Sequence, residues 1–321
     1  MKSLHENLIN WYLANRRPLP WRKDKNPYTI WISEVMLQQT TVAAVIPYFE
    51  RFIERFPNQH TLAQAELSEV YEYWAGLGYY SRARNLHASA KIISDSGFPE
   101  DYSQLIQLPG FGPYTARAVA SLAFDQKVGV LDGNVIRVLS RVHGLSIEWW
   151  TQAGRKKLQH FADKLAQIDD SATVNQGLME LGATICTPQA PLCALCPWQK
   201  HCKAVARNLV SRLPLKKPRK KQEIWVWEPD LICKNKLWAV QKNDYAPFLK
   251  NQWIFPGKIK TQSEKPKSFD LTHGITHHSI YVKINLSTQK LSKNKDIKWV
   301  NSKELKKLTP SSLLQKVLQK V

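Results

Sequence analysis

Four of the five cysteines in this chain of 321 residues lie within one 17-residue segment, with the spacing Cys186-x6-Cys193-x2-Cys196-x5-Cys202. Thiolates this close along the chain can converge on one centre, and their soft sulfur atoms suit zinc or an iron–sulfur cluster. Zinc sites usually pair two short C-x-x-C-type knuckles, which the x6 and x5 spacings fit poorly. The segment 186–202 is therefore expected to fold around a metal centre, and a zinc loop that only ties down a tail is the simpler alternative.

The remaining composition argues against a secreted or membrane-spanning protein. No uninterrupted apolar run approaches the length needed to cross a bilayer, and residues 1–10 are polar where a signal peptide is hydrophobic. Five cysteines are also few for a disulfide framework, and clustered thiolates favour a reducing compartment. We expect a cytoplasmic protein without a membrane partner.

Positive charge is concentrated in the last third of the chain. The whole sequence has 46 Lys and Arg against 26 Asp and Glu, a net charge of +20. Residues 1–206 carry a net charge of only +3, whereas residues 207–321 carry 25 basic and 8 acidic side chains, a net charge of +17. A field of this sign captures polyanions, so DNA or RNA is the leading partner; an anionic membrane or a merely well-solvated surface are weaker readings.

The patterning predicts two domains. Apolar residues recur at helical spacing throughout residues 1–206, which predicts an all-helical domain that includes the cysteine loop. Residues 207–222 contain two prolines and a basic run, the composition of an exposed linker. Residues 223–321 predict a small α+β domain. Its strands are expected over 223–233, 237–242 and 279–286, and its helices over 302–308 and 311–320.

A glycine-rich turn separates two of the predicted helices. The stretch Leu108-Pro109-Gly110-Phe111-Gly112-Pro113-Tyr114-Thr115 places Gly110 and Gly112 two residues apart, directly before an alanine-rich helix. Glycines let the main chain approach a ligand closely, and a helix N-terminus offers free N–H groups, so the turn suits a DNA phosphate. Most such turns between helices are only turns, so this signal is weak by itself.

Two carboxylates stand out. Asp132 precedes a helix in Leu131-Asp132-Gly133-Asn134, the usual setting of an N-cap. Glu34 is the single acid in an otherwise apolar helix, 31–40. If its neighbours shelter Glu34 from water, desolvation raises its pKa and lets it hold a proton near neutral pH; a surface glutamate on an amphipathic helix is the commoner case.

Taken together, these motifs resemble the iron–sulfur DNA glycosylases of the helix-hairpin-helix superfamily, the group of endonuclease III and the MutY-type adenine glycosylases. The cysteine spacing is that of the family's cluster, and Leu-Pro-Gly-x-Gly-x-x-Thr-Ala resembles its hairpin. Residues 33–40, Ser-Glu-Val-Met-Leu-Gln-Gln-Thr, resemble the adenine-specific branch. The resemblance implies a helix-hairpin-helix domain and a structural [4Fe-4S] cluster that helps to position DNA. Its ligands would be Cys186, Cys193, Cys196 and Cys202.

The resemblance also implies roles in base removal. Glu34 would protonate the departing base, and Asp132 would stabilise the positive charge that develops on the sugar. Relatives that also cut the strand carry a nucleophilic lysine where this chain has Tyr114, so the resemblance implies base removal without strand cleavage. Tyr114 and Asn134 would orient groups around the sugar.

Further positions match the parts of the family that extrude and hold the base. Gln39 and Tyr79 match the residues that wedge the duplex open, although a tyrosine at a helix start is often only a packing residue. Trp21, Arg22 and Gln176 match contacts of the adenine pocket.

In the predicted second domain, Asn251-Gln252-Trp253-Ile254-Phe255-Pro256-Gly257 resembles an element of the family's Nudix-like domain, which reads 8-oxoguanine. The glutamate-rich helix that would bind metal in a hydrolysing relative is absent after Gly257, which implies reading without hydrolysis. Ile275-Thr276-His277 takes the place of a Phe-Ser-His element that contacts the oxidised base. Thr276 and His277 can still contact that base, whereas an isoleucine cannot stack on it as phenylalanine does.

The sequence thus predicts a monofunctional adenine DNA glycosylase, acting as a monomer in the nucleoid-associated cytoplasm on duplexes with A·8-oxoguanine or A·G mispairs. A thymine glycosylase for G·T mismatches is the nearest alternative, because its relatives share the cluster and the tyrosine. A catalytically silent damage-binding protein is the alternative of another class.

Overall fold

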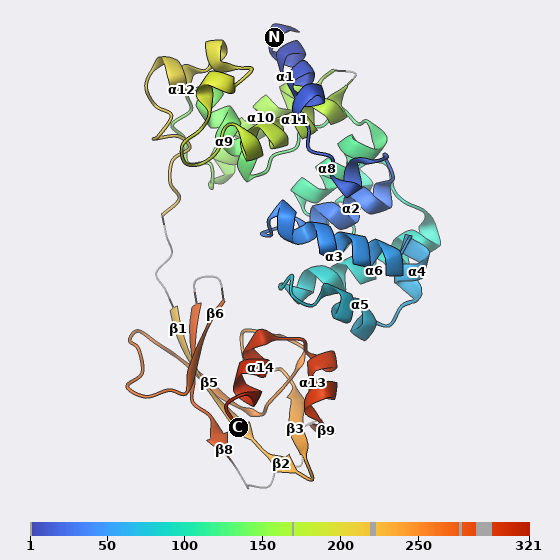
Figure 1. Ribbon diagram of the computed structural model, residues 1–321, viewed down its shortest axis with the longest axis vertical. Helices are drawn as coiled ribbons and strands as arrows, with labels where there is room; N and C mark the ends of the chain where they lie inside the picture. Colours follow the sequence, from blue (N-terminus) through green and yellow to red (C-terminus); the bar gives the residue numbers. More distant parts are fainter. Residues whose placement is uncertain (1, 169, 219–222, 276–277, 287–296) are drawn as a thin grey trace. The chain divides into compact units, whose positions relative to one another are not determined.

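The structure is a computed structural model that describes residues 2–168, 170–218, 223–275, 278–286 and 297–321 (Figure 1). The chain divides into two compact units, Met1–Ala65 with Tyr79–Pro218, and Glu66–Gly78 with Arg219–Val321. The first unit is helical, and the second contains two β-sheets, two C-terminal helices and the helix Leu67–Trp74. The predicted fold class, a helical domain followed by a small α+β domain, is confirmed.

The helices begin where the sequence supplies capping groups. The side chains of Asn58, Asp132, Thr151 and Asp170 each accept a hydrogen bond from a backbone N–H in the first turn, and proline occupies the first position of two further helices. The longer helices before the cysteine segment are α1 (Lys2–Asn15), α2 (Pro27–Met36), α3 (Val42–Arg55), α4 (Gln59–Gln64), α5 (Leu67–Trp74), α6 (Tyr80–Ser96), α8 (Pro113–Phe124), α9 (Gly133–Val142), α10 (Gln152–Ala166) and α11 (Ser171–Thr184). Short helical turns complete the set: η1 (Pro20–Arg22), α7 (Tyr102–Leu105), η2 (Cys193–Leu195), η3 (Gln199–His201) and α12 (Lys203–Ala206).

Helix α11 is central to the packing of the first unit, because α1, α8, α9 and α10 all contact it. Val135, Leu139, Leu178 and Leu181 form part of a buried apolar core between α9 and α11. Trp198 from the cysteine segment is 1% exposed in the same core. The cysteine segment is therefore anchored on the helices α9 and α11.

The predicted glycine-rich turn lies between α7 and α8. Gly110 has a φ of +79°, and a Cβ atom there would lie 2.7 Å from the Cβ of Asn85 on α6. Both the backbone angle and the lack of space require glycine at this position. Gly112 is the exposed N-cap of α8, and a side chain at this position would meet no other atom within 4 Å.

The second unit contains two sheets. In the first, the strands are ordered β5 (Gly257–Gln262), β1 (Glu223–Leu231), β7 (His278–Val282) and β6 (Leu271–Ile275), with β8 (Asn285–Leu286) also paired to β1. The pairing of β1 with β7 and β8 is parallel, and the other pairings are antiparallel. In the second sheet, β3 (Leu237–Lys242) pairs with β2 (Cys233–Lys234), β4 (Trp253–Ile254) and β9 (Ile297–Val300), all antiparallel.

The helices α13 (Ser302–Leu308) and α14 (Ser312–Leu318) complete the core of the second unit with Leu305, Leu313 and Val317. These side chains belong to one core with Trp227 on β1 and Phe255 between β4 and β5. The strands and helices predicted for this unit are present, but β4, β5, β6 and β9 were not predicted. Strand β5 begins at Gly257, the last residue of the Trp-x-Phe-Pro-Gly element, so the chain continues from this element as a strand and not as a helix.

Among the described residues, no helix is long and apolar enough to cross a membrane. Thr276 and His277, predicted to contact the oxidised base, lie outside the described residues.

Candidate active site

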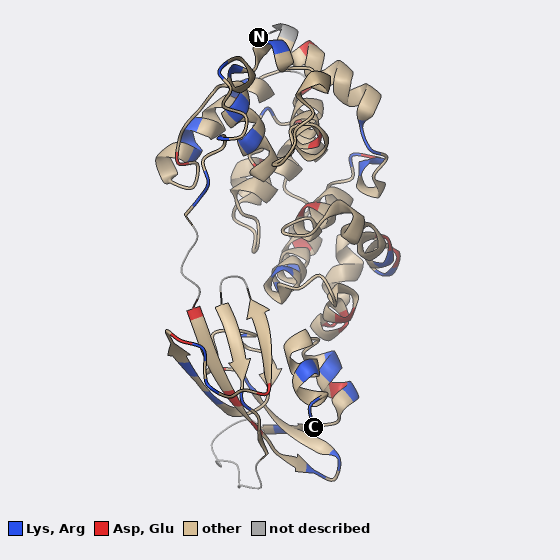
Figure 2. Ribbon diagram, turned by 60° about the vertical axis from the view of Figure 1, so that its left-hand side comes forward, with Lys and Arg blue, Asp and Glu red and all other residues tan. Residues whose placement is uncertain are grey.

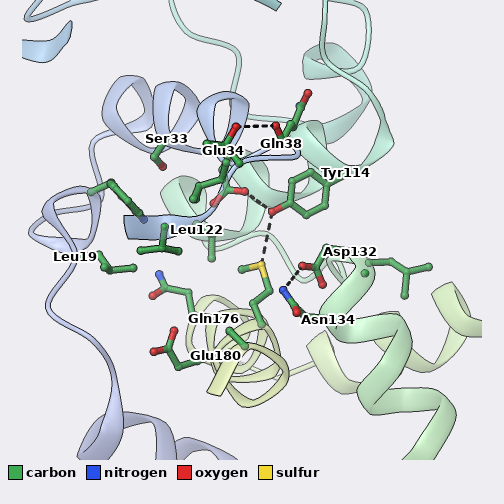
Figure 3. Close-up of a pocket in the computed structure, with 18 of the residues that line it drawn as sticks. Leu19, Ser33, Glu34, Gln38, Tyr114, Leu122, Asp132, Asn134, Gln176 and Glu180 are labelled. Atoms are coloured by element: carbon green, nitrogen blue, oxygen red, sulfur yellow. Dashed lines mark hydrogen bonds between the residues drawn. The ribbon is translucent and has the colours of Figure 1, made fainter. Parts of the chain in front are cut away.

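A cavity of about 530 Å³ lies within the helical unit, between η1, α2, the start of α8, the start of α9 and α11 (Figure 3). Most of the residues predicted to act on the base line this one cavity. They are Trp21, Arg22, Glu34, Gln39, Tyr114, Asp132, Asn134 and Gln176. They come from segments that lie up to 155 residues apart in the chain, so only the packing of the helices brings them together.

Glu34 is 4% exposed on the inner face of α2 and accepts a hydrogen bond from the hydroxyl of Tyr114 on α8. Burial raises the pKa of Glu34 to about 7, aided by the negative charge of Asp132 and opposed by the Tyr114 hydrogen bond and by Arg22. Burial also raises the pKa of Tyr114 well above its ordinary value. At neutral pH a large fraction of Glu34 therefore holds a proton, beside a tyrosine that stays neutral.

Asp132 lies at the N-terminus of α9 and caps it. Its Oδ1 accepts a hydrogen bond from the N–H of Val135 at 2.7 Å, and its Oδ2 accepts one from the Asn134 amide at 2.8 Å. Burial raises the pKa of Asp132, and these hydrogen bonds together with the charge of Arg137 oppose that rise. The capping predicted from the sequence is present, and the net shift of the pKa is upward.

Three groups that sequence reasoning missed also line the cavity: Arg17, Met179 and Glu180. Met179 accepts a hydrogen bond from Tyr114, with 3.7 Å between Sδ and the hydroxyl oxygen. Glu180 is 1% exposed and accepts hydrogen bonds from Arg17 and Arg22. One signal was available for Glu180, because it is an isolated acid in the apolar run Gly177-Leu-Met-Glu-Leu-Gly, just as Glu34 is in its own helix.

The two predicted wedge residues share an unusual backbone conformation. Gln39 and Tyr79 are both exposed, and their backbone φ angles are +60° and +49°, values that residues other than glycine rarely adopt. Arg82 connects their two turns. Its guanidinium donates to the carbonyl oxygens of Val35 and Gln38, both at 2.7 Å, and lies 5.5 Å from the centre of the Tyr79 ring.

The four clustered cysteines line a second, small hollow together with apolar side chains of α9 and α11. Arg141, which is 3% exposed, donates to the Sγ of Cys186 at 3.4 Å and to the carbonyl oxygen of Thr187 at 2.7 Å. Within the described residues, no three ligand side chains come close enough together to hold a single metal ion. Four thiol side chains that line one apolar hollow supply the soft sulfur ligands of an iron–sulfur cluster or of zinc.

The fold and the site define a base excision DNA repair protein: residues 32–167 match the HhH-GPD superfamily of base excision DNA repair proteins. The adenine DNA glycosylase of Buchnera aphidicola subsp. Schizaphis graminum is 38% identical over 338 residues, which cover 97% of this chain and 96% of that protein. The human adenine DNA glycosylase is 45% identical over 213 residues, 63% of this chain and 39% of that one. The chain belongs to the family of adenine DNA glycosylases.

Solved structures agree on the helical fold. A thermostable thymine-DNA glycosylase has a TM-score of 0.59 at 29% identity, over 64% of this chain and 96% of that one. A non-covalent endonuclease III–DNA complex has a TM-score of 0.54 at 22% identity, over 65% of this chain and 96% of that one, and shows the fold alone. A thymine glycosylase thus shares the fold, while two relatives that align over more than four fifths of this chain are adenine DNA glycosylases by name.

Proposed function

We propose that this DNA N-glycosylase hydrolyses the bond between deoxyribose and an adenine that is mispaired with 8-oxoguanine or guanine. The observation that carries the proposal is the pairing, in one cavity, of a carboxyl group that holds a proton near pH 7, Glu34, with a second carboxylate at a helix N-terminus, Asp132. Cleavage of a glycosidic bond needs one proton donor and one stabilising anion. The described cavity supplies both.

In the proposed reaction, an adenine flipped out of the duplex enters the cavity, and Glu34 donates its proton to N7. The bond between N9 and C1′ then breaks with its electron pair moving to the base, while Asp132 stabilises the positive charge on the sugar. Water adds to C1′ and gives up a proton, which completes the hydrolysis. The Tyr114 hydroxyl and the Asn134 amide hold the two carboxyl groups in place.

The same geometry supports base release without strand cleavage. Strand cleavage by this fold requires an amine that attacks C1′ and forms an imine. Tyr114 occupies the position where strand-cutting relatives have a nucleophilic lysine. Burial raises the pKa of Tyr114, so its hydroxyl stays protonated. We therefore propose no more than weak lyase activity.

Cys186, Cys193, Cys196 and Cys202 would hold a [4Fe-4S] cluster in the hollow that they line. When bound, the cluster would supply a structural crosslink between the loop and helices α9 and α11, since hydrolysis requires no electron transfer. Replacement of Cys193 by serine should lower the iron content per chain and the visible absorbance of the purified protein.

The second unit is proposed to read the base opposite the adenine. Lys and Arg residues are spread over its strands, loops and helix α13 (Figure 2). Gly257, in the Trp-x-Phe-Pro-Gly element, has no space for a side chain, because a Cβ would lie 2.3 Å from the carbonyl oxygen of Glu228 on the paired strand β1. We propose the division into 1–206, 207–222 and a Nudix-like 223–321, and a protein that acts on genomic DNA as a monomer.

The experiment uses end-labelled duplexes with A·8-oxoguanine, A·G, A·T, T·G or U·G pairs, each analysed with and without hot alkali. Strand breaks in A·8-oxoguanine and A·G that need alkali are the expected result. Breaks confined to T·G would instead assign the protein to thymine release, and binding without any release would make it a damage-binding protein. Breaks that form without alkali as readily as with it would contradict the proposal of no more than weak lyase activity.

A further inference from the structure

Glu180 is a buried carboxylate that lines the cavity without contacting the two carboxyl groups used in the proposed reaction. It lies one helical turn after Gln176 on α11, and both side chains face the cavity (Figure 3). Arg17 binds it in a bidentate manner, with Nε at 2.6 Å from Oε1 and one terminal nitrogen at 2.9 Å from Oε2. Arg22 donates to the same Oε2 at 2.9 Å.

These contacts fix the direction of both guanidinium groups. Burial raises the pKa of Glu180, but the hydrogen bonds and charges of Arg17 and Arg22 outweigh burial and leave the pKa below its ordinary value. An ionised carboxylate with a bidentate arginine partner is a strong and directional pair. Arg22 is held at a second point, since its other terminal nitrogen donates to the carbonyl oxygen of Arg17 at 3.3 Å.

The neighbouring amide of Gln176 is oriented in a similar way. The hydroxyl of Tyr12, on α1, donates to its Oε1. This bond orients the amide and takes one lone pair of its oxygen, while both N–H bonds of the NH2 group remain for a bound molecule. The guanidinium of Arg22 lies 5.6 Å from the centre of the Tyr12 ring, so the arginine pair and the amide belong to one connected group.

The carboxylate of Glu180 and the amide oxygen of Gln176 thus already receive hydrogen bonds from the protein, and the groups that this wall mainly offers to a base are N–H donors. Each guanidinium has five N–H donors, more than the contacts described above consume. A wall of donors binds the ring nitrogens that accept hydrogen bonds. Adenine has such an acceptor at N1, whereas hypoxanthine and guanine have an N–H donor there, as thymine has at N3.

We infer that Glu180 is a positioning residue that sets base selectivity, by holding Arg17 and Arg22 as fixed donors beside Gln176. This inference rests on the proposed function, because it assumes that the cavity receives the flipped base. It predicts that the enzyme reads N1 of the base as an acceptor. It also explains why an acid is buried at the edge of a site whose reaction does not use it.

The test measures single-turnover release of adenine, unsubstituted purine and hypoxanthine, each opposite 8-oxoguanine, by the full-length protein. Purine keeps the N1 acceptor and lacks the amino group, whereas hypoxanthine carries N1–H. For the unaltered protein, release of hypoxanthine should be much slower than release of the other two. Glu180→Gln should slow adenine release and narrow the ratio of adenine to hypoxanthine release at least tenfold.

Asp125→Asn is the matched control, because Asp125 also pairs with a basic side chain, Lys25, but on the surface and outside the cavity. It should leave the ratio unchanged. Arg17→Gln, whose side chain is 36% exposed, should narrow the ratio as well and carries the test if Glu180→Gln does not fold. Equal slowing of all three bases in both variants, or no change, would overturn the inference. Absence of adenine release by the unaltered protein would instead reject the proposed function, and the inference with it.

Discussion

The guanidinium of Arg137 donates from Nε to the carbonyl oxygen of Cys186 at 2.7 Å. Its terminal nitrogen donates to Asn134 at 2.8 Å, and Asn134 in turn donates to Asp132. The first cysteine of the cluster segment and the carboxylate in the cavity are therefore joined through two side chains. We propose that binding of a cluster by the cysteine segment and the position of Asp132 are coupled through these hydrogen bonds.

Arg137→Gln should break the hydrogen-bonded connection between Cys186 and Asp132. Glutamine is too short to reach both the Cys186 carbonyl and Asn134, so the Asn134 amide loses its support. Its hydrogen bond to Oδ2 of Asp132 then weakens, while the bond from the Val135 N–H to Oδ1 remains. We expect adenine release to slow ten- to hundredfold, about the effect of removing a supporting hydrogen bond behind a site. Arg51→Gln, which changes an exposed arginine on α3, is the control. An unchanged rate in a chain that retains its iron would exclude the coupling.

Glu34→Gln removes the proton donor but keeps the size of the side chain. Base release should fall by about 10² to 10⁴, the usual contribution of a positioned acid. Affinity for the A·8-oxoguanine duplex should change less than threefold in a gel-shift titration, because the substitution removes no positive charge. Release at more than a tenth of the original rate would exclude Glu34 as the donor.

The rate of base release should depend on pH through Glu34. Its pKa of about 7 means that the protonated fraction, and with it the rate, falls about tenfold per pH unit above that value. The Tyr114 hydrogen bond lowers this pKa, so Tyr114→Phe should move the alkaline limb of the single-turnover pH profile to higher pH. A limb that stays in place would show that another group gives up the proton.

The same shift has a consequence for stability. Because the folded state holds the Glu34 proton up to about pH 7 and the unfolded state releases it near pH 4.5, folding stability is lost as the pH rises through this interval. Glu34→Gln has no proton to lose. The free energy of unfolding of the variant minus that of the unaltered protein should therefore be more positive at pH 8 than at pH 4.5. Chemical denaturation of both proteins at both pH values measures this difference.

Arg82→Gln tests the link between the two proposed wedge residues. Without the guanidinium, the turn that carries Gln39 loses its bonds to Arg82, and Tyr79 loses the charge beside its ring. With 2-aminopurine placed opposite 8-oxoguanine, the rise in fluorescence on binding should shrink at least twofold, since fewer bases are unstacked. Arg51→Gln should give the full rise. An equal rise in both variants would show that Arg82 does not support the opening of the duplex.

The parts of the site that could be predicted from the sequence are those marked by a pattern of neighbouring residues. Glu34 is an acid in an apolar run, Asp132 precedes a helix, and the cysteines have a distinctive spacing. No local sequence pattern indicates the ion pair of Arg17 and Glu180, because the two residues lie 163 residues apart and meet only after α1 packs against α11. The short strands β4 and β9 were missed for the same reason, since their partners in the second sheet determine them.

The indole N–H of Trp198 donates to the carbonyl oxygen of Leu4 at 2.8 Å, across 194 residues. During synthesis, roughly 10 to 40 s pass between the emergence of these two residues at ordinary elongation rates. During that interval, helix α1 lacks part of the surface that buries it. Tyr12 on α1 and Arg17 just after it likewise lack their partners on α11 until that helix is synthesised. The cavity described above is therefore completed late in translation, after α11 has been synthesised.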